Sequence, residues 1–372
     1  MLCMILVSCT GQKTGKENDN NDKIAIEVGE IKFPPQDVLQ LKSYYLSSSV
    51  HVDSIDYLIG YNYRLHSLDC MNLKSKSVTQ IVLPGDGPDA IVRLSGIYAQ
   101  SLDSVWISDE SERAFLIDSV GTIKRMIDLK KYLEDQEQLL INTNYVMFTS
   151  HLFYNASRHS LMFLVKHTPS NTFIVKEVFI DEVGKMATYQ LSSSKVVPDM
   201  SKGYAYINFP NVNFVGENIV YNYPVESSIY MLDIRTNERK YILADSHYTS
   251  NIIEKCTTSG DYATLEKHWL ENSHFYDIMY LPKYKIYARL QLYKVDFDEK
   301  KGMEKLINER DLYLMLFDEN MEKIGETKLS NCRYSPFTSW NATYGGIALF
   351  VDNVLDEKNN TDDLTIDIIS LK

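Results

Sequence analysis

Short apolar runs separated by turn residues dominate the sequence from Ile24 onwards. Most runs span about five residues, which is the usual length of a β-strand. Few helical patterns intervene, and this argues against βαβ units and a parallel sheet. The predicted strands are 56–60, 64–68, 78–83, 104–108, 114–118, 161–165, 172–176, 218–222, 228–233, 286–290, 312–317, 347–351 and 364–371.

A weak repeat underlies these runs. Three times a strand ends in an aspartate (Asp118, Asp233 and Asp318), a polar turn follows, and another strand returns. Such a carboxylate can accept hydrogen bonds from the turn backbone. Recurring hairpins of this kind fit propeller blades. Six blades would average about 57 residues each, although seven or eight tighter blades or a pair of two-sheet sandwiches also fit the length.

We therefore predict an all-β chain that forms a six-bladed β-propeller with short helical insertions in its loops. The first insertion, 129–141, places Leu129, Tyr132, Leu133 and Leu140 near one face of a helix. The second spans 259–272 and could start with Asp261 as its N-cap. Binding residues favour loops on a rigid scaffold, so we expect them near these insertions.

The N-terminus carries a lipoprotein-like signal. Residues 1–7 are apolar, and Leu6-Val7-Ser8-Cys9 resembles the lipobox of bacterial lipoproteins, which implies acylation of Cys9. Every residue of 10–23 is polar, as expected of a flexible tether. We assign 1–8 to a signal peptide, truncated because it is short and lacks a basic residue, 9–23 to the lipidated cysteine and tether, and 24–372 to the propeller domain.

The same signal predicts the location of the protein. Acyl chains on Cys9 would hold it on a membrane, because each buried methylene contributes about 0.8 kcal/mol. Thr10 lacks the aspartate associated with inner-membrane retention, so by analogy we expect the outer membrane. No apolar stretch reaches 18 residues, so we expect no membrane span. The 50 acidic and 38 basic residues give a net charge of -12, and we expect no nucleic-acid partner.

Candidate chemical motifs lead to no predicted catalytic residue, metal or cofactor. Gly85-Asp-Gly-Pro88 lacks the Lys and helix of a phosphate-binding loop, so it is interpreted as a turn. His268, Glu271 and His274 lack a completing ligand, and we expect a solvated helix face rather than a metal site. The acidic loops 296–299 and 352–363 fail the EF-hand order and are interpreted as solvated turns. Nucleophile motifs such as G-x-S-x-G are absent from the sequence.

Cysteine use gives no sign of a metal site either. The three cysteines beyond residue 23, Cys70, Cys256 and Cys332, are isolated in sequence and allow at most one disulfide. We expect them to be buried as small apolar side chains.

Tyrosine is the unusual residue, with 26 Tyr against 14 Phe. Tyrosine suits half-buried sheet positions.

Two stretches resemble a known family. Residues 83–91, with Ile97, 105–109 and 115–118, resemble the Gly-x-Gly-Pro turn and following strands of six-bladed NHL/TolB-like propellers. Residues 276–290 are similar to a late blade of the Bacteroides-type lipoproteins grouped as domain of unknown function 4221. The resemblance implies a six-bladed propeller and supplies no catalytic residues.

We expect a non-enzymatic propeller, anchored to the cell envelope, that binds a protein or glycan partner. The alternative is a carbohydrate hydrolase or lyase with its active site in the central funnel. Clustered Asp, Glu, His and Arg at the inner strand ends would favour the enzyme. A funnel lined by apolar or tyrosine side chains would favour binding.

Overall fold

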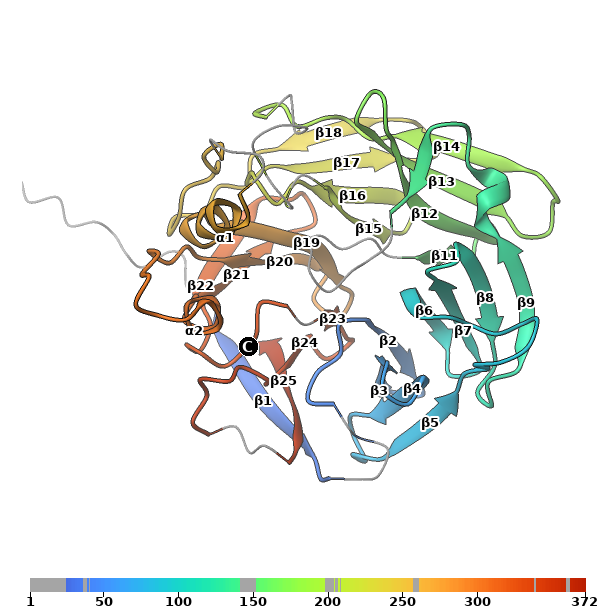
Figure 1. Cartoon of the computed structure of the whole chain (residues 1–372), viewed down its shortest axis with the longest axis horizontal. Coiled ribbons are helices and arrows are strands. Elements are labelled where there is room, and N and C mark those ends of the chain that lie inside the picture. The colour runs from blue at the N-terminus through green and yellow to red at the C-terminus, as the bar shows by residue number, and fades with distance from the viewer. Residues whose placement is uncertain are drawn as a thin grey trace, which may run out of the picture.

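The computed structural model describes residues 25–35, 39, 41–140, 152–197, 204, 207, 209–256, 261–337, 339–358 and 362–372. The predicted signal peptide, Cys9 and tether lie outside these residues. The described strands form six antiparallel sheets that follow one another around a ring, as Figure 1 shows. The expected six-bladed, all-β propeller is therefore confirmed.

Blades 1, 2, 4 and 5 each contain four consecutive strands, named here from the axis outwards. Blade 1 consists of β2 (Ser47–Val52), β3 (Ile55–Asn62), β4 (Ser67–Asn72) and β5 (Val78–Val82). Blade 2 consists of β6 (Leu94–Ser101), β7 (Ser104–Asp109), β8 (Arg113–Ile117) and β9 (Ile123–Asp128). Blade 4 consists of β15 (Asn211–Val215), β16 (Asn218–Asn222), β17 (Ile229–Asp233) and β18 (Arg239–Ile242). Blade 5 consists of β19 (His274–Leu281), β20 (Ile286–Leu292), β21 (Leu312–Phe317) and β22 (Lys323–Lys328).

Blades 3 and 6 depart from this pattern. In blade 3, β10 (Glu137–Leu139) and β11 (Phe153–Asn155) pair with opposite ends of β12 (Ser160–His167). The blade continues with β13 (Thr172–Phe179) and β14 (Met186–Gln190). Blade 6 combines β23 (Trp340–Ala342), β24 (Ile347–Phe350) and β25 (Leu364–Leu371) with the N-terminal strand β1 (Ile26–Phe33). The pairing of β1 with β25 completes blade 6 with strands from both ends of the domain and so closes the ring, and β1 forms the outer edge of this blade.

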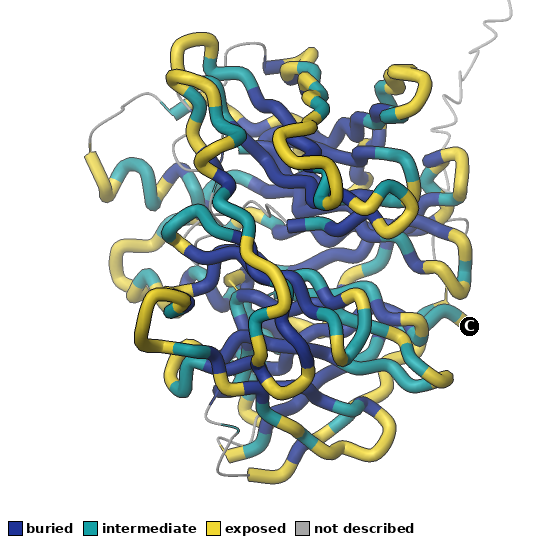
Figure 2. The backbone as a smooth tube through the Cα atoms, turned by 90° about the vertical axis from the view of Figure 1, so that its right-hand side faces the viewer, coloured by how far each residue is buried: buried dark blue, intermediate teal, exposed yellow. Residues whose placement is uncertain are grey.

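Apolar side chains hold neighbouring blades together. Figure 2 shows that the strands are largely buried and that exposed residues lie mainly in the loops. One cluster packs blade 1 on blade 2 through residues such as Ile59 and Ile107, and another packs blade 2 on blade 3 through Trp106 and Phe163. A third joins blades 4 and 5 through Val220 and Phe317. Each blade in the ring therefore packs on two neighbouring blades, one through each face of its sheet.

Most predicted strands coincide with observed ones, and the three aspartate turns are confirmed. The Oδ1 atom of each aspartate accepts two backbone N–H bonds, from Val120 and Thr122, from Arg235 and Thr236, and from Asn320 and Glu322 respectively. The predicted strand 64–68 is wrong because residues 63–66 form the turn between β3 and β4, where His66 takes a left-handed φ of 51°.

One predicted helix is confirmed and the other is wrong. Helix α1 (Tyr262–Glu271) begins after Asp261, whose carboxylate accepts the N–H of Ala263. The segment 129–141 instead starts as a single 3-10 turn, η1 (Leu129–Tyr132), and continues into β10. Its apolar side chains pack in the core between blades 2 and 3, so tertiary burial overrides the helical spacing. A second helix, α2 (Met303–Asn308), was not predicted.

The two faces of the ring differ in their connections. Because successive strands are antiparallel, loops after the first and third strands of each blade share one face, and the other loops share the opposite face. The first face has connections of two to six residues, and we call it the turn face. The opposite, long-loop face contains the described residues of the segments 34–46, 83–93, 191–210, 243–273, 293–311, 329–339 and 351–363, together with short connections such as 63–66 and 110–112.

Both ends of the described domain lie at the turn face. Strand β1 begins there, and β25 ends there beside it. The backbone N–H of Lys372 donates to the carbonyl of Ala25 over 3.0 Å. The chain therefore enters the propeller on the side opposite the long loops.

Candidate binding face

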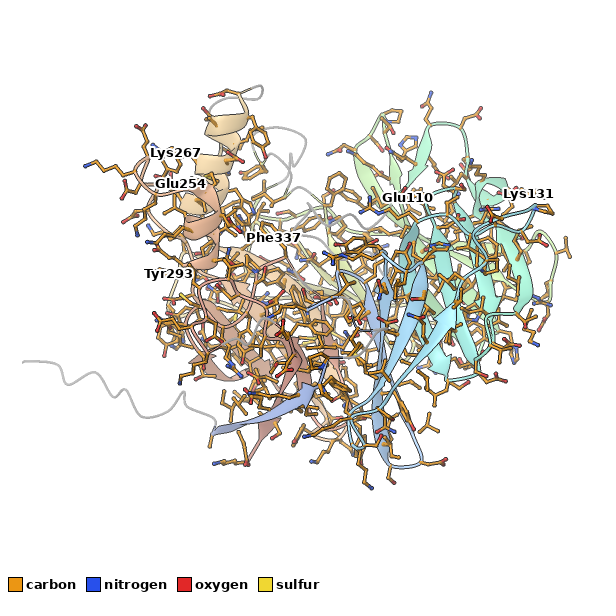
Figure 3. The ribbon with its side chains drawn as sticks, turned by 60° about the horizontal axis from the view of Figure 1, so that its bottom comes forward. Glu110, Lys131, Glu254, Lys267, Tyr293 and Phe337 are labelled. Carbon is orange, nitrogen blue, oxygen red and sulfur yellow. The ribbon has the colours of Figure 1, made fainter. Side chains whose placement is uncertain are left out.

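Exposed large apolar side chains gather on the long-loop face. Those in its segments are Tyr63, Val92, Val196, Leu243, Tyr248, Ile252, Tyr262, Phe337 and Val354, whereas the turn segments hold Val120, Val183 and Tyr344. Figure 3 shows α1 projecting from this face, with Phe337 and Glu110 toward the same side. Exposed apolar side chains on loops of a rigid scaffold are typical of binding surfaces, so this face is the candidate site.

A tyrosine cluster lies where blades 1 and 2 meet on this face; we define it as Tyr45, Tyr61, Tyr63 and Arg93. The ring centroids of Tyr45 lie 6.1 Å from those of both Tyr61 and Tyr63. The Arg93 guanidinium lies 5.6 Å from the Tyr45 ring centroid, and its Nε donates to the Tyr45 hydroxyl over 3.4 Å. Tyr63 is 50% exposed, while Tyr61 is buried and its pKa is raised to about 12 by burial. The Tyr61 hydroxyl therefore stays neutral at physiological pH.

The loop 83–93 beside this cluster is held in place by buried polar contacts. Arg113 Nη2 donates to the Ala90 carbonyl over 2.7 Å and to Asp109 Oδ2 over 2.6 Å. Gly87, with a φ of 92°, forms the turn that the sequence predicted, and its carbonyl accepts the Ala90 N–H. Arg93 at the end of this loop is thus presented by a fixed backbone.

A tryptophan cluster occupies the same face at blades 5 and 6; we define it as Trp269, His274, Arg310 and Phe337. The Trp269 ring stacks on Phe337 and on His274, each at 5.5 Å between centroids. Arg310 lies 4.5 Å from the Trp269 ring centroid. Phe337 is 40% exposed, whereas Arg310 and His274 are buried. The cluster thus holds one exposed aromatic ring on a rigid base.

The protonation of His274 follows from its contacts. Arg310 also donates to the carbonyls of Tyr293, Trp269 and Asn272, and its Nη2 lies 3.3 Å from His274 Nδ1. Because a guanidinium only donates, Nδ1 accepts and the imidazole proton lies on Nε2. Burial, reinforced by the charge of Arg310, holds the pKa of His274 well below its usual value. His274 is therefore a neutral structural histidine.

The prediction of a solvated helix face is wrong for His268 and His274, whereas Glu271 lies in α1 with 38% of its side chain exposed. His268 lies in α1 but is buried, with its Nε2 2.6 Å from the Glu254 carbonyl oxygen. His274 begins β19 rather than continuing the helix, because α1 ends at Glu271. Among the described residues, no group of three or more His, Cys, Asp or Glu side chains could hold a metal ion.

The other residues that the sequence singled out are those of the acidic loops and the cysteines. Asp296, Asp298 and Glu299 are exposed in the loop after β20, as expected of a solvated turn. No disulfide joins the three described cysteines, and only Cys70 is buried, so the prediction of burial is wrong for Cys256 and Cys332. Both lie in long-loop segments, where packing is incomplete. None of the described helices is long and apolar enough to cross a membrane.

Small polar and aromatic side chains join the inner strands around the axis. The Ala99 N–H donates to Ser48 Oγ, and Asn213 Nδ2 donates to the Ile278 carbonyl, both over 3.0 Å. Aromatic rings stack between blades 3 and 4, where the Phe153 and Phe214 centroids lie 4.7 Å apart. In the described inner strands, hydrogen bonds from side chains and ring stacking thus join neighbouring blades.

The described inner strands provide two carboxylates, and they lie in different blades. Glu137 of blade 3 is buried in an ion pair with Lys176. Asp277 of blade 5 accepts the indole N–H of Trp340 over 2.9 Å. A glycosidase needs two carboxylates that face one bond about 5 to 10 Å apart. Each of these acids is instead engaged by a partner within the fold.

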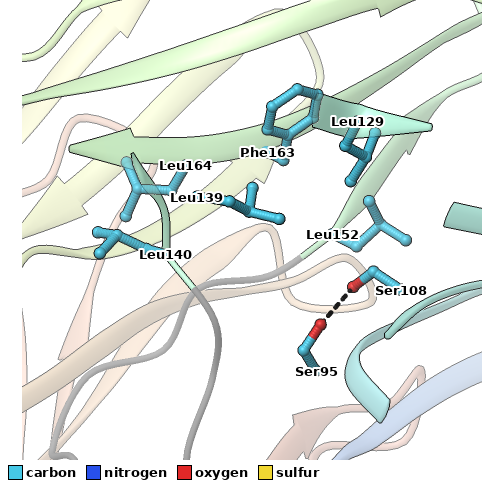
Figure 4. Close-up of a pocket in the computed structure, with 8 residues that line it drawn as sticks. All are labelled: Ser95, Ser108, Leu129, Leu139, Leu140, Leu152, Phe163 and Leu164. Carbon is cyan, nitrogen blue, oxygen red and sulfur yellow. Dashed lines mark hydrogen bonds between the residues drawn. The ribbon is translucent and has the colours of Figure 1, made fainter. Parts of the chain in front are cut away.

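A small cavity lies between blades 2 and 3, as Figure 4 shows. Its volume is about 10 Å³, and the hydroxyls of Ser95 and Ser108 lie 3.1 Å apart in its wall. The other lining residues are Leu129, Leu139, Leu140, Leu152, Phe163 and Leu164. A space of this size accommodates about one water molecule, so the cavity is not a ligand site.

Sequence reasoning did not identify either aromatic cluster. In the tyrosine cluster, Tyr45, Tyr63 and Arg93 come from three separate loops, so no spacing along the chain links them. The abundance of tyrosine and the loop containing Gly85 were the available signals. These signals predicted strands and a turn. The residues of the cluster come together only when the ring closes.

Solved structures confirm the fold. A member of the DUF4221 family from Bacteroides vulgatus has 14% identity and a TM-score of 0.73, and the match covers 95% of this chain and 99% of that one. A putative exported protein from Bacteroides fragilis has 13% identity and a TM-score of 0.57, covering 93% and 95% respectively. No curated protein matches the chain in sequence. The sequence model of a domain of unknown function, DUF4221, matches residues 17–328, and the chain therefore belongs to this family of six-bladed propellers.

Proposed function

We propose that this protein is a lipoprotein, anchored to the outer membrane through Cys9, that binds a protein or glycan partner with its long-loop face. The observation that carries the proposal is the asymmetry of the ring. Its ends and its short turns lie on one face, and its long loops with their exposed apolar side chains lie on the other. An anchored propeller of this shape would present its loops away from the membrane.

The length of the tether is compatible with this arrangement. Residues 10–24 connect Cys9 to Ala25 at the turn face. A polar tether of this length has a root-mean-square extent of about 20 Å and a maximum of about 50 Å. The turn face would thus stay near the lipid headgroups. The exported relative from Bacteroides fragilis supports a non-cytoplasmic location by analogy.

The lipid anchor is tested by fractionation of cells that express the full chain. Cys9→Ser should move the protein from the membrane fraction to the soluble fraction and remove acyl mass from its N-terminal peptide. Cys3→Ser is the matched control, because it changes a leader cysteine outside the lipobox. A Cys9→Ser protein that stays in the membrane fraction would reject the anchor.

The binding face is tested by photo-crosslinking in intact cells. A photoreactive amino acid at Phe337 or Tyr63 should capture an envelope component, because both side chains are exposed on the long-loop face. The matched controls are Val120 and Val183, which are exposed on the turn face. Capture from the turn-face positions alone would reject the proposed face.

A further inference from the structure

We propose that the tyrosine cluster is a binding site for a neutral saccharide. The proposal rests on the proposed function, since it names one ligand class for the long-loop face. Of the two aromatic clusters on that face, this one combines exposed rings with hydrogen-bonding groups of both kinds. Four observations support the assignment, namely its rings, its polar pair, its charge and its rigidity.

The rings of Tyr63 and Tyr45 provide a stacking surface. Tyr63 is 50% exposed and Tyr45 is half-buried behind it, with an interplanar angle of 45°. A pyranose presents polarised C–H bonds on one face, and these pack on the electron-rich face of an aromatic ring. Tyr61 supports Tyr45 from below in an edge contact with an interplanar angle of 78°. The two outer rings are therefore held in position without losing their exposed surfaces.

A donor and an acceptor flank these rings. Arg93 and Glu110 are each about half exposed, with 48% and 45% of their side chains accessible. Their Nε and Oε1 atoms lie 3.6 Å apart, and Arg93 uses its Nε–H on the Tyr45 hydroxyl. The guanidinium has four further N–H donors, and the carboxylate accepts several bonds. Neighbouring sugar hydroxyls, which both donate and accept, match this pair.

The charge of the face favours a neutral ligand. In the described long-loop segments acidic side chains outnumber basic ones, and the whole chain has 50 acidic and 38 basic residues. An anionic glycan would be repelled at long range and would find one arginine already facing Glu110. A neutral saccharide meets no such barrier.

Rigidity of the loop lowers the cost of binding. Arg113 and Asp109 fix the backbone of 83–93, and the Ile91 N–H donates to the Pro84 carbonyl over 2.8 Å. Little side-chain or loop entropy is then lost when a ligand is bound. The tryptophan cluster differs, because Trp269 already contacts two rings and the Arg310 guanidinium, and Phe337 has no comparable polar pair in the described contacts.

The test is isothermal titration calorimetry on the full-length protein in detergent. The probes are neutral hexasaccharides of glucose, mannose, xylose and galactose, with hexagalacturonate as the anionic comparator. At least one neutral probe should bind, and Tyr63→Ala and Arg93→Ala should each weaken it about tenfold or more. Tyr344→Ala, a similarly exposed tyrosine on the turn face, should leave the affinity within twofold. Circular dichroism checks that each variant is folded.

Three results would overturn the assignment. They are no binding of any neutral hexasaccharide at millimolar concentration, binding of hexagalacturonate at equal or higher affinity, or equal losses from Tyr63→Ala and Tyr344→Ala. Capture of an envelope protein through Phe337 without saccharide binding would reject this inference and leave the proposed function standing. Saccharide binding by a protein that proves to be unanchored would reject the anchor and keep the site.

Discussion

Arg333 links three segments at the closure of the ring, and its removal should weaken the whole propeller. Its Nε and Nη2 atoms donate to the two carboxylate oxygens of Asp367 on β25, over 2.5 and 2.8 Å. Nη2 also reaches Glu30 on β1 over 2.8 Å, and Nη1 reaches Asp356 over 3.3 Å. The perturbation we choose is Arg333→Met, which keeps much of the apolar stem and removes the charge.

The expected cost comes mainly from Asp367. This carboxylate is fully buried, and without Arg333 it keeps the Tyr334 hydroxyl at 2.8 Å as its remaining side-chain donor. Removing one partner of a buried ion pair costs about 3–5 kcal/mol. The Glu30 carboxylate is 42% exposed, so its share is at most about 1 kcal/mol. Because Arg333 itself remains 17% accessible, we expect about 3–4 kcal/mol in total.

Urea denaturation followed by tryptophan fluorescence measures this loss, with refolding checked at each concentration. The midpoint should fall while the slope stays constant. The matched control is Arg125→Met, whose ion pair with Asp181 is exposed, and it should cost less than about 1 kcal/mol. The double variant Arg333→Met, Asp367→Asn should recover part of the loss. A single Arg333→Met variant within 1 kcal/mol of the parent would refute the reasoning.

Three further predictions concern a turn, an acid and a thiol. Gly121→Ala should lower the free energy of unfolding, measured in urea, by about 1–3 kcal/mol, because φ is 85° and an added Cβ would lie 2.5 Å from a backbone oxygen. Gly87→Ala should cost less, because its φ is also positive but an added Cβ there would meet no atom within 4 Å. Lys124 and turn N–H groups lower the pKa of Asp118 to about 2, so the contribution of its carboxylate to folding stability is complete above the pKa of the unfolded chain and disappears as pH falls toward 2. The difference in unfolding free energy between the parent and Asp118→Asn should therefore narrow over that pH range. A difference that stays constant would contradict this. Burial raises the pKa of Cys70 to about 12, so iodoacetamide should modify Cys332 in the native protein but Cys70 only after denaturation, as peptide mass spectrometry would show.

The sequence by itself determined the local elements whose signals are local. The runs 218–222 and 312–317 coincide with β16 in blade 4 and β21 in blade 5, because their apolar residues are contiguous and turn residues bound them. Asp118 closes its turn because its carboxylate reaches N–H groups two and four residues ahead. Asp261 caps α1 for the same short-range reason. Repeated hairpins then made a propeller the natural arrangement.

The tertiary structure decided everything that depends on distant pairs. The segment 129–141 has helical spacing, but the core between blades 2 and 3 draws its apolar side chains into a 3-10 turn and a strand. His274 became a buried neutral partner of Arg310 because α1 ends before it and β19 begins. The tyrosine cluster exists because ring closure brings separate loops together on one face. Hydrogen bonds between residues a few positions apart can be predicted from the local sequence, whereas contacts between blades depend on how the complete ring packs.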